Sequence, residues 1–146
     1  IRPFTYIEKD VRIGNHCVIG PFAHLRPGVR VGNDVEIGNF TEVSRTQIGD
    51  KTLMKHFGFL GDASVGSNVN IGAGTVTANY DGRQKNPTTI ENVAFIGSDS
   101  ILIAPVKIGR KAIVGAGSVV TKGKVVPDGG IAVGVPAKII LRRKRG

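Results

Sequence analysis

The sequence has no tryptophan, a single cysteine and only 5% aromatic residues. With so few large rings, small and branched side chains must fill the interior. The single cysteine, Cys17, excludes an internal disulfide, and no Cys or His pair has the spacing of a metal site. We expect Cys17 to be a small buried hydrophobic residue.

Long apolar segments are also missing from the sequence. No stretch reaches the roughly 20 apolar residues that span a bilayer, and the N-terminus lacks the basic and apolar regions of a signal peptide. We therefore expect a cytoplasmic protein without membrane insertion. The chain begins with Ile1 rather than Met, which is compatible with a further domain upstream.

The net charge of +9 raises the question of a polyanionic partner. Nucleic-acid binding requires basic residues on a folded face with aromatic or groove-fitting elements, so we expect no nucleic-acid partner. The basic C-terminus is either a solvated tail or a neighbour of a phosphate-rich ligand. Five cations fall within its last nine residues: Lys138, Arg142, Arg143, Lys144 and Arg145.

An aliphatic residue recurs every six positions, and this repeat is the dominant pattern in the sequence. A period of six matches neither an α-helix nor an ordinary strand. The two regular runs are Ile1, Ile7, Ile13, Ile19, Leu25, Val31, Ile37 and Val43, then Ile90, Ile96, Leu102, Ile108, Val114 and Val120. Between them the register slips by one residue twice, which gives Ile48, Met54 and Leu60, then Val65, Ile71 and Thr77.

Each repeat predicts one short strand and one turn. A second small or branched residue lies two positions before the aliphatic, as at Val11 and Ala23, so both side chains point to the same side of a strand. Glycine commonly follows the aliphatic, as at Gly14, Gly20 and Gly49, and we expect these glycines to turn the chain with positive φ. Stacked coils then pair equivalent strands, which predicts an all-β parallel β-helix of hexapeptide repeats.

One polar, turn-forming segment between Thr77 and Ile90 breaks the repeat. It predicts a looped-out insertion at about 78–89. Insertions in repeat proteins gather on a binding face, so we expect this loop to contact a ligand, and a spacer without function is the alternative. The predicted organisation is one β-helix domain over residues 1–126 and a short basic C-terminal tail over 127–146.

Several strings in the chain are more specific than the repeat. They are residues 19–28 (IGPFAHLRPG), 31–33 (VGN), 60–63 (LGDA), 68–75 (NVNIGAGT) and 79–82 (NYDG). Together they resemble the C-terminal acetyltransferase domain of the bacterial bifunctional N-acetylglucosamine-1-phosphate uridyltransferase/glucosamine-1-phosphate N-acetyltransferase family. The resemblance covers roughly residues 11–121, and the uridyltransferase domain of that family is not present in this chain.

The resemblance implies features that the repeat itself does not give. Parallel crossovers are generally right-handed, whereas hexapeptide-repeat acyltransferases wind left-handed with three repeats per coil. The family also implies a homotrimer with its sites between subunits. The implied reaction moves an acetyl group from acetyl-CoA to the amine of glucosamine-1-phosphate or a close amino-sugar phosphate, and acetyl transfer requires no metal.

The resemblance also implies a catalytic pair. His56 matches the position of the general base, and an imidazole suits the removal of a proton from an attacking amine at neutral pH. Glu42 matches an acidic neighbour that would orient this histidine. Without the resemblance, Glu42 would be read as a solvated charge on a strand.

Other positions match the binding residues of the family. Arg26 matches a sugar-phosphate anchor, because a guanidinium fork suits a phosphate monoester. Further expected acceptor contacts are Arg45, Asn70 and the loop residues Asn79, Tyr80 and Lys85, which would reach a neighbouring subunit. The expected acetyl-CoA contacts are Ala73, Ser98, Ala116 and Lys138, with the backbone N–H of Ala73 as a donor to the oxyanion.

Three departures from the family pattern leave other functions open. Ser44 stands where the family has lysine, Phe59 stands where it has tyrosine, and Gly134 begins a different C-terminal string. These changes are consistent with an acetyltransferase for another amino sugar or a hydroxyl acceptor. A non-catalytic trimerisation or regulatory module of a nucleotidyltransferase is a second alternative. A zinc-dependent carbonic anhydrase of the same repeat type is disfavoured, because the three histidines share no phase of the repeat.

Overall fold

The structure is a computed structural model that describes residues 1–140. The basic residues Arg142, Arg143, Lys144 and Arg145 therefore lie outside the described residues. Within residues 1–140 the regular structure consists of strands, with no helix, and no segment meets the requirements for a membrane-spanning helix.

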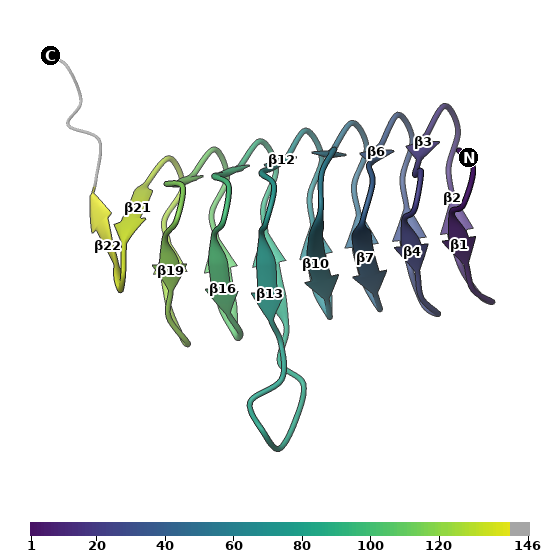
Figure 1. Ribbon diagram of the computed structural model, residues 1–146. Helices are drawn as coiled ribbons and strands as arrows, with labels where there is room; N and C mark the ends of the chain where they lie inside the picture. The colour runs from purple at the N-terminus through teal and green to yellow at the C-terminus, as the bar shows by residue number, and fades with distance from the viewer. Residues whose placement is uncertain (141–146) are drawn as a thin grey trace, which may run out of the picture.

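Three parallel sheets form the faces of a prism (Figure 1). Sheet A contains β1 (Tyr6–Ile7), β4 (His24–Leu25), β7 (Thr41–Ser44), β10 (Gly58–Gly61), β13 (Val76–Ala78), β16 (Ile101–Ile103) and β19 (Val119–Val120). Sheet B contains β2 (Arg12–Ile13), β5 (Arg30–Val31), β8 (Gln47–Ile48), β11 (Ala63–Val65), β14 (Thr88–Ile90), β17 (Val106–Ile108) and β20 (Val125–Val126). Sheet C contains β3 (Val18–Ile19), β6 (Glu36–Ile37), β9 (Leu53–Met54), β12 (Asn70–Ile71), β15 (Phe95–Ile96), β18 (Ile113–Val114), β21 (Ile131–Gly134) and β22 (Ala137–Ile140).

The chain visits the sheets in the order A, B, C and winds left-handed from one end of the prism to the other (Figure 1). Strand pairing gives the length of each coil. Ile7 pairs with Leu25 and Leu25 pairs with Val43, so these coils have 18 residues. Val43 pairs with Leu60, so the next coil is one residue shorter. The predicted left-handed β-helix is confirmed, and a shortened coil accounts for a register slip.

The repeated aliphatic residues form a continuous core along the prism. Ile19, Leu25, Ile37, Ile96 and Leu102 are fully buried. At the first coil the expectation of burial is wrong, because Ile1 is 68% exposed and no coil of the described structure covers it. Cys17 is half-buried and packs against the edge of the core rather than inside it.

The glycines after the aliphatic residues have a different role from the predicted one. Of Gly14, Gly20 and Gly49, only Gly20 has positive φ. A Cβ on Gly14 would lie 2.5 Å from the carbonyl oxygen of Gly32, and a Cβ on Gly49 would lie 2.6 Å from the carbonyl carbon of Gly66. These glycines are therefore needed because adjacent coils approach too closely for a side chain.

The positive φ values occur mainly two residues later in the turns, and many belong to residues other than glycine. His16, Asp34 and Lys51 have φ between 56° and 58°. The prediction that corner residues of the coil adopt positive φ was right. The prediction that the glycines directly after the aliphatic residues adopt it was wrong for most of them.

The predicted insertion lies between β13 and β14 and projects from the prism (Figure 1). Tyr80 and Lys85 form an isolated antiparallel bridge at its base. At the other end of the repeat, β21 pairs in parallel with β18, and β22 turns back to pair antiparallel with β21. Strands β21 and β22 thus continue sheet C beyond residue 126. The division into a domain over 1–126 and a tail over 127–146 stays a prediction.

Candidate functional site

Two hollows lie at opposite edges of sheet A. The turns from sheet A to sheet B form one edge, which we call the A–B corner, and the turns from sheet C to sheet A form the other, the C–A corner. Most of the predicted site residues lie at these two corners, although they come from separate coils. The fold therefore brings the predicted site together around one sheet.

The hollow at the A–B corner has a volume of about 220 Å³ and is rich in cations. We call it the cationic hollow. It collects four residues predicted to contact the acceptor, the predicted catalytic carboxylate, and the two side chains that depart from the family pattern. Its lining residues are Arg26, Glu42, Ser44, Arg45, Phe59, Asn79 and Lys85.

Both arginines of the cationic hollow are held by carboxylates. The Nε of Arg26 donates to Glu42 Oε1 at 2.6 Å. The Nε and Nη2 of Arg45 donate to the two oxygens of Asp62 at 2.6 and 2.9 Å, and its Nη1 donates to Ser44 Oγ at 2.8 Å. The hydrogen bonds from Arg45 lower the pKa of Asp62, while partial burial opposes this shift. The carboxylate therefore remains ionised at neutral pH.

The hollow at the C–A corner has a volume of about 240 Å³ and contains the predicted base. We call it the histidine hollow. Its lining residues are Lys55, His56, Asn70, Ile71, Gly72, Ala73 and Ser98. It thus unites the predicted general base, one predicted acceptor contact and two of the predicted acetyl-CoA contacts.

The predicted acetyl-CoA contacts at the C–A corner stack on successive coils. The N–H of Asp99 donates to the carbonyl oxygen of Ala73 at 2.7 Å, and the N–H of Gly117 donates to that of Ser98 at 2.8 Å. Ala116 consequently lies one coil beyond Ser98, outside the lining of the histidine hollow. This line of small residues leads from His56 along the corner toward the C-terminal end of the prism.

The observed side-chain contact of Glu42 is with Arg26 and not with its predicted partner His56. Glu42 lies on the outer face of β7, paired in register with His24 and Phe59, and its carboxylate contacts Arg26. His56 lies in the turn before β10, where its carbonyl oxygen accepts a hydrogen bond from Thr41 Oγ1 at 3.0 Å. The role of Glu42 in orienting His56 stays a prediction, and its observed contact is with the arginine.

The insertion contributes Asn79 and Lys85 to the cationic hollow, whereas Tyr80 lines neither hollow and is 61% exposed. Asp81 organises the loop, because its Oδ1 accepts the N–H groups of Arg83 at 3.0 Å and Gln84 at 2.8 Å. Its Oδ2 accepts Asn86 Nδ2 at 2.9 Å. These hydrogen bonds, with Gln84 first, hold the pKa of Asp81 well below its usual range.

Sequence reasoning assigned no role to Asp62 or Asp81, although both lie in strings that carry the resemblance. The spacing along the coil would have revealed the contact of Asp62. Asp62 follows Arg45 by 17 residues, which is one shortened coil, so their turns had to stack. Lys138 is exposed on β22 and lines neither hollow, and its predicted contact with acetyl-CoA stays a prediction.

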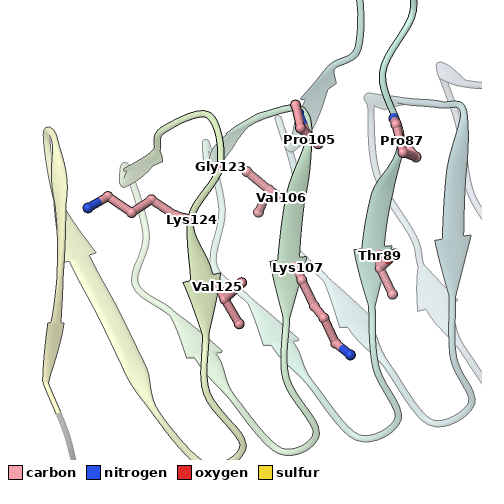
Figure 2. A pocket seen from close by; sticks show the side chains of 8 residues that line it. All are labelled: Pro87, Thr89, Pro105, Val106, Lys107, Gly123, Lys124 and Val125. Atoms are coloured by element: carbon pink, nitrogen blue, oxygen red, sulfur yellow. The ribbon is translucent and has the colours of Figure 1, made fainter.

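A third hollow collects none of the predicted site residues (Figure 2). It has a volume of about 310 Å³ and is lined by residues of β14, β17 and β20 and of the turns before them, with the Lys107 and Lys124 side chains extending away in opposite directions. In residues 1–140, His, Cys, Asp and Glu side chains form no group of three that would hold a metal ion.

The comparisons with known proteins concern the fold and the family of the chain. Residues 10–45 match the family described as bacterial transferase hexapeptide (six repeats), and residues 87–122 match the hexapeptide repeat of succinyl-transferase. The bifunctional protein GlmU of Thermodesulfovibrio yellowstonii is 53% identical over 97% of the chain, and that of Thermosipho africanus is 41% identical over all of it. The chain spans only 27% and 28% of the length of these relatives.

Two solved structures share the fold. The N-acyltransferase AntD from Bacillus cereus, in complex with dTDP and coenzyme A, is 25% identical, with a TM-score of 0.81 over 92% of this chain and 84% of its own. GDP-perosamine N-acetyl transferase from Caulobacter crescentus, in complex with CoA and GDP-perosamine, is 28% identical, with a TM-score of 0.59 over 90% of this chain and 58% of its own. The chain therefore belongs to the hexapeptide-repeat transferases and corresponds to the C-terminal part of the bifunctional GlmU proteins.

Proposed function

We propose that this chain transfers an acetyl group from acetyl-CoA to the amine of glucosamine-1-phosphate or a close amino-sugar phosphate. Its relatives are bifunctional GlmU proteins, and the structures with the same fold are N-acyltransferases that hold coenzyme A. The cationic hollow suits the phosphate of the acceptor, because guanidinium and ammonium groups are the usual partners of phosphate oxygens.

The single observation that carries this proposal is the position of the two hollows. Strand β7 runs between them, with Thr41 beside the backbone of His56 and Ser44 beside Arg45. A strand advances about 3.3 Å per residue, so these ends lie about 10 Å apart. Arg26 lies at the A–B end of this span and His56 at the C–A end. One small amino-sugar phosphate would therefore reach the cations with its phosphate and the imidazole with its amine.

The chemistry follows from this placement. The imidazole of His56 takes a proton from the amine as its nitrogen attacks the thioester carbonyl, and a general base contributes roughly 10²- to 10⁴-fold in rate. The new C–N bond forms, the C–S bond breaks, and the CoA thiolate leaves with a proton as free thiol. The backbone N–H of Ala73, at the edge of the histidine hollow, is the proposed donor to the oxyanion.

We further propose that the working unit is a homotrimer. The outer face of sheet A carries Phe59 and Ile101, and that of sheet C carries Ile113 and Phe95, which is 49% exposed. The outer row of sheet B is mostly polar, with members such as Arg12, Arg30, Gln47 and Lys107. Contacts through sheets A and C would bury apolar side chains and bring residues of a second copy toward the site.

Thiol release from acetyl-CoA tests the proposed reaction. We expect release with glucosamine-1-phosphate and little with glucosamine, which lacks the phosphate that Arg26 would bind. His56→Ala should reduce kcat by about 100-fold or more while the protein stays folded and of unchanged oligomeric state. Unchanged transfer by His56→Ala would discard the catalytic role and favour a non-catalytic module.

Another acceptor is the second candidate. Ser44 and Phe59 line the cationic hollow at the two positions that depart from the family pattern. The related N-acetyl transferase from Caulobacter crescentus is found with a nucleotide sugar. A panel that includes nucleotide-linked amino sugars and hydroxyl acceptors separates these functions, since faster release with one of them than with glucosamine-1-phosphate would reassign the acceptor.

A further inference from the structure

Asp62 lies against Arg45, a lining residue of the cationic hollow, and neither the sequence nor the resemblance explains its position. It lies in the turn between β10 and β11, and its backbone adopts a φ of 51°. Its N–H donates to the carbonyl oxygen of Ser44 at 3.0 Å, which fixes this turn above the previous coil. The carboxylate is consequently presented at the A–B corner beside Arg45, with 20% of its side chain exposed.

The carboxylate of Asp62 receives donors from Arg45 and Asn79, two lining residues of the cationic hollow. The Nε and Nη2 of Arg45 form a bidentate pair with its two oxygens at 2.6 and 2.9 Å. Asn79 Nδ2, at the base of the insertion, donates to Oδ2 at 2.5 Å. Asn79 in turn accepts the N–H of Asn86 through its carbonyl oxygen at 2.7 Å, which closes the base of the loop.

These contacts leave part of Arg45 available. A guanidinium has five N–H donors, and Arg45 commits two to Asp62 and one to Ser44 Oγ. The two remaining N–H groups belong to Nη1 and Nη2, which form the end of the fork. Without a partner, a half-exposed arginine loses substantial rotamer entropy when it binds a ligand. A partner that already fixes the side chain removes this cost from ligand binding.

We infer that Asp62 is a positioning residue. It holds the guanidinium of Arg45 so that the two remaining N–H groups face an oxyanion. It also ties the base of the insertion, residues 79–87, to the same arginine. Arg26 and Glu42 repeat the arrangement one coil away, since Arg26 also donates through Nε to a carboxylate at 2.6 Å. The ligand class is a phosphate or a phosphate monoester. The inference rests on the proposed function of the cationic hollow and adds a residue that acts through Arg45 rather than through the ligand.

The test measures inorganic phosphate binding by calorimetry and acetyl transfer kinetics in parallel. In Asp62→Asn we expect phosphate affinity to fall about tenfold and KM for the amino-sugar phosphate to rise by a similar factor, the size expected when a charge-assisted hydrogen bond loses its alignment. KM for acetyl-CoA should change less than about twofold. Asp50→Asn is the matched control, since Asp50 is a turn carboxylate that accepts the N–H of Asn33 at 2.7 Å, remote from the hollow.

A double-mutant cycle separates positioning from a structural effect. Arg45→Lys keeps the charge and loses the fork, so it should weaken phosphate binding about as much as Asp62→Asn does. The double variant should be no more than about twofold weaker than either single variant. Unchanged phosphate affinity in either single variant, or additive losses in the double variant, would overturn the inference. If Asp62→Asn does not fold, Asp62→Glu keeps the charge and displaces the carboxylate, and unchanged phosphate affinity in that variant would overturn the inference.

The same experiment distinguishes failure of the inference from failure of the proposed function. If phosphate binding depends on Asp62 but no acceptor is acetylated by the wild type, the proposed reaction fails and the anion site stands. If the wild type acetylates an amino-sugar phosphate while Asp62→Asn leaves phosphate affinity intact, the reaction stands and the inference fails.

Discussion

At the residue scale, spacing along the coil determines which side chains meet. Glu42 is 18 residues after His24 and 16 after Arg26, and it contacts Arg26. His56 is 14 residues after Glu42, which places it in the preceding turn of the next coil, at the opposite edge of the sheet. Many of the residues that the resemblance implies line the two hollows, and their roles stay predictions. The length of the coil already favoured Arg26 over His56 as the partner of Glu42.

Glu42→Gln separates the two roles of this carboxylate. We expect KM for the amino-sugar phosphate to rise about three- to tenfold, because Arg26 loses its partner, while kcat stays within about threefold. Steady-state kinetics with both substrates would measure this. Glu91→Gln, which removes a comparable ion pair to Lys107 at 3.3 Å, is the control. A large fall in kcat with unchanged KM would instead support an orienting role toward His56.

At the element scale, the sequence predicted where the turns lie better than it predicted the contacts between turns of successive coils. The repeat located the corners and the insertion, because a period of six is visible in any single coil. The reason for the glycines was missed, because the steric limit at Gly14 comes from the backbone of Gly32, one coil away. The contact of Asp62 with Arg45 likewise joins two successive coils, whereas the contacts of Asp81 are local to the insertion.

Asp81→Asn should loosen the insertion without affecting the prism. The side chain accepts the N–H groups of Arg83 and Gln84, and the neutral amide is a weaker acceptor than a carboxylate. We expect faster hydrogen exchange at those two amides and unchanged exchange at buried Leu102. The pKa of Asp81 is lowered, so the wild-type loop should keep its protection above pH 4 and lose it as the pH falls through the lowered pKa. Equal exchange in both proteins would contradict this account of the loop.

At the scale of the whole molecule, each coil contacts mainly the coil before and the coil after it. The fold class and the direction of the core follow from this one-dimensional order, which is why the repeat in a single sequence predicts them. The 18-residue coil was implied by the family resemblance instead. The separation of the two hollows across sheet A follows as well, once each site residue is assigned to a corner.

Position along the prism should set the cost of a core substitution. Ile37 is fully buried between coils, so Ile37→Ala should lower the free energy of unfolding by about 2–5 kcal/mol. Ile7 has the same chemistry but is 36% exposed, so Ile7→Ala should cost about 1 kcal/mol. Denaturant unfolding of both variants tests this. Equal losses of unfolding free energy in the two variants would contradict the view that each coil contributes separately to stability.

Strand β22 has a consequence for how the prism ends. A row of unpaired N–H and C=O groups at the rim of a sheet is a template on which another chain can add a strand. Because β22 runs antiparallel over β21, it becomes the edge strand of sheet C and faces the end of the prism in the reversed direction. On this face, a second copy could not continue the parallel coil-on-coil pairing and would have to begin on a reversed strand.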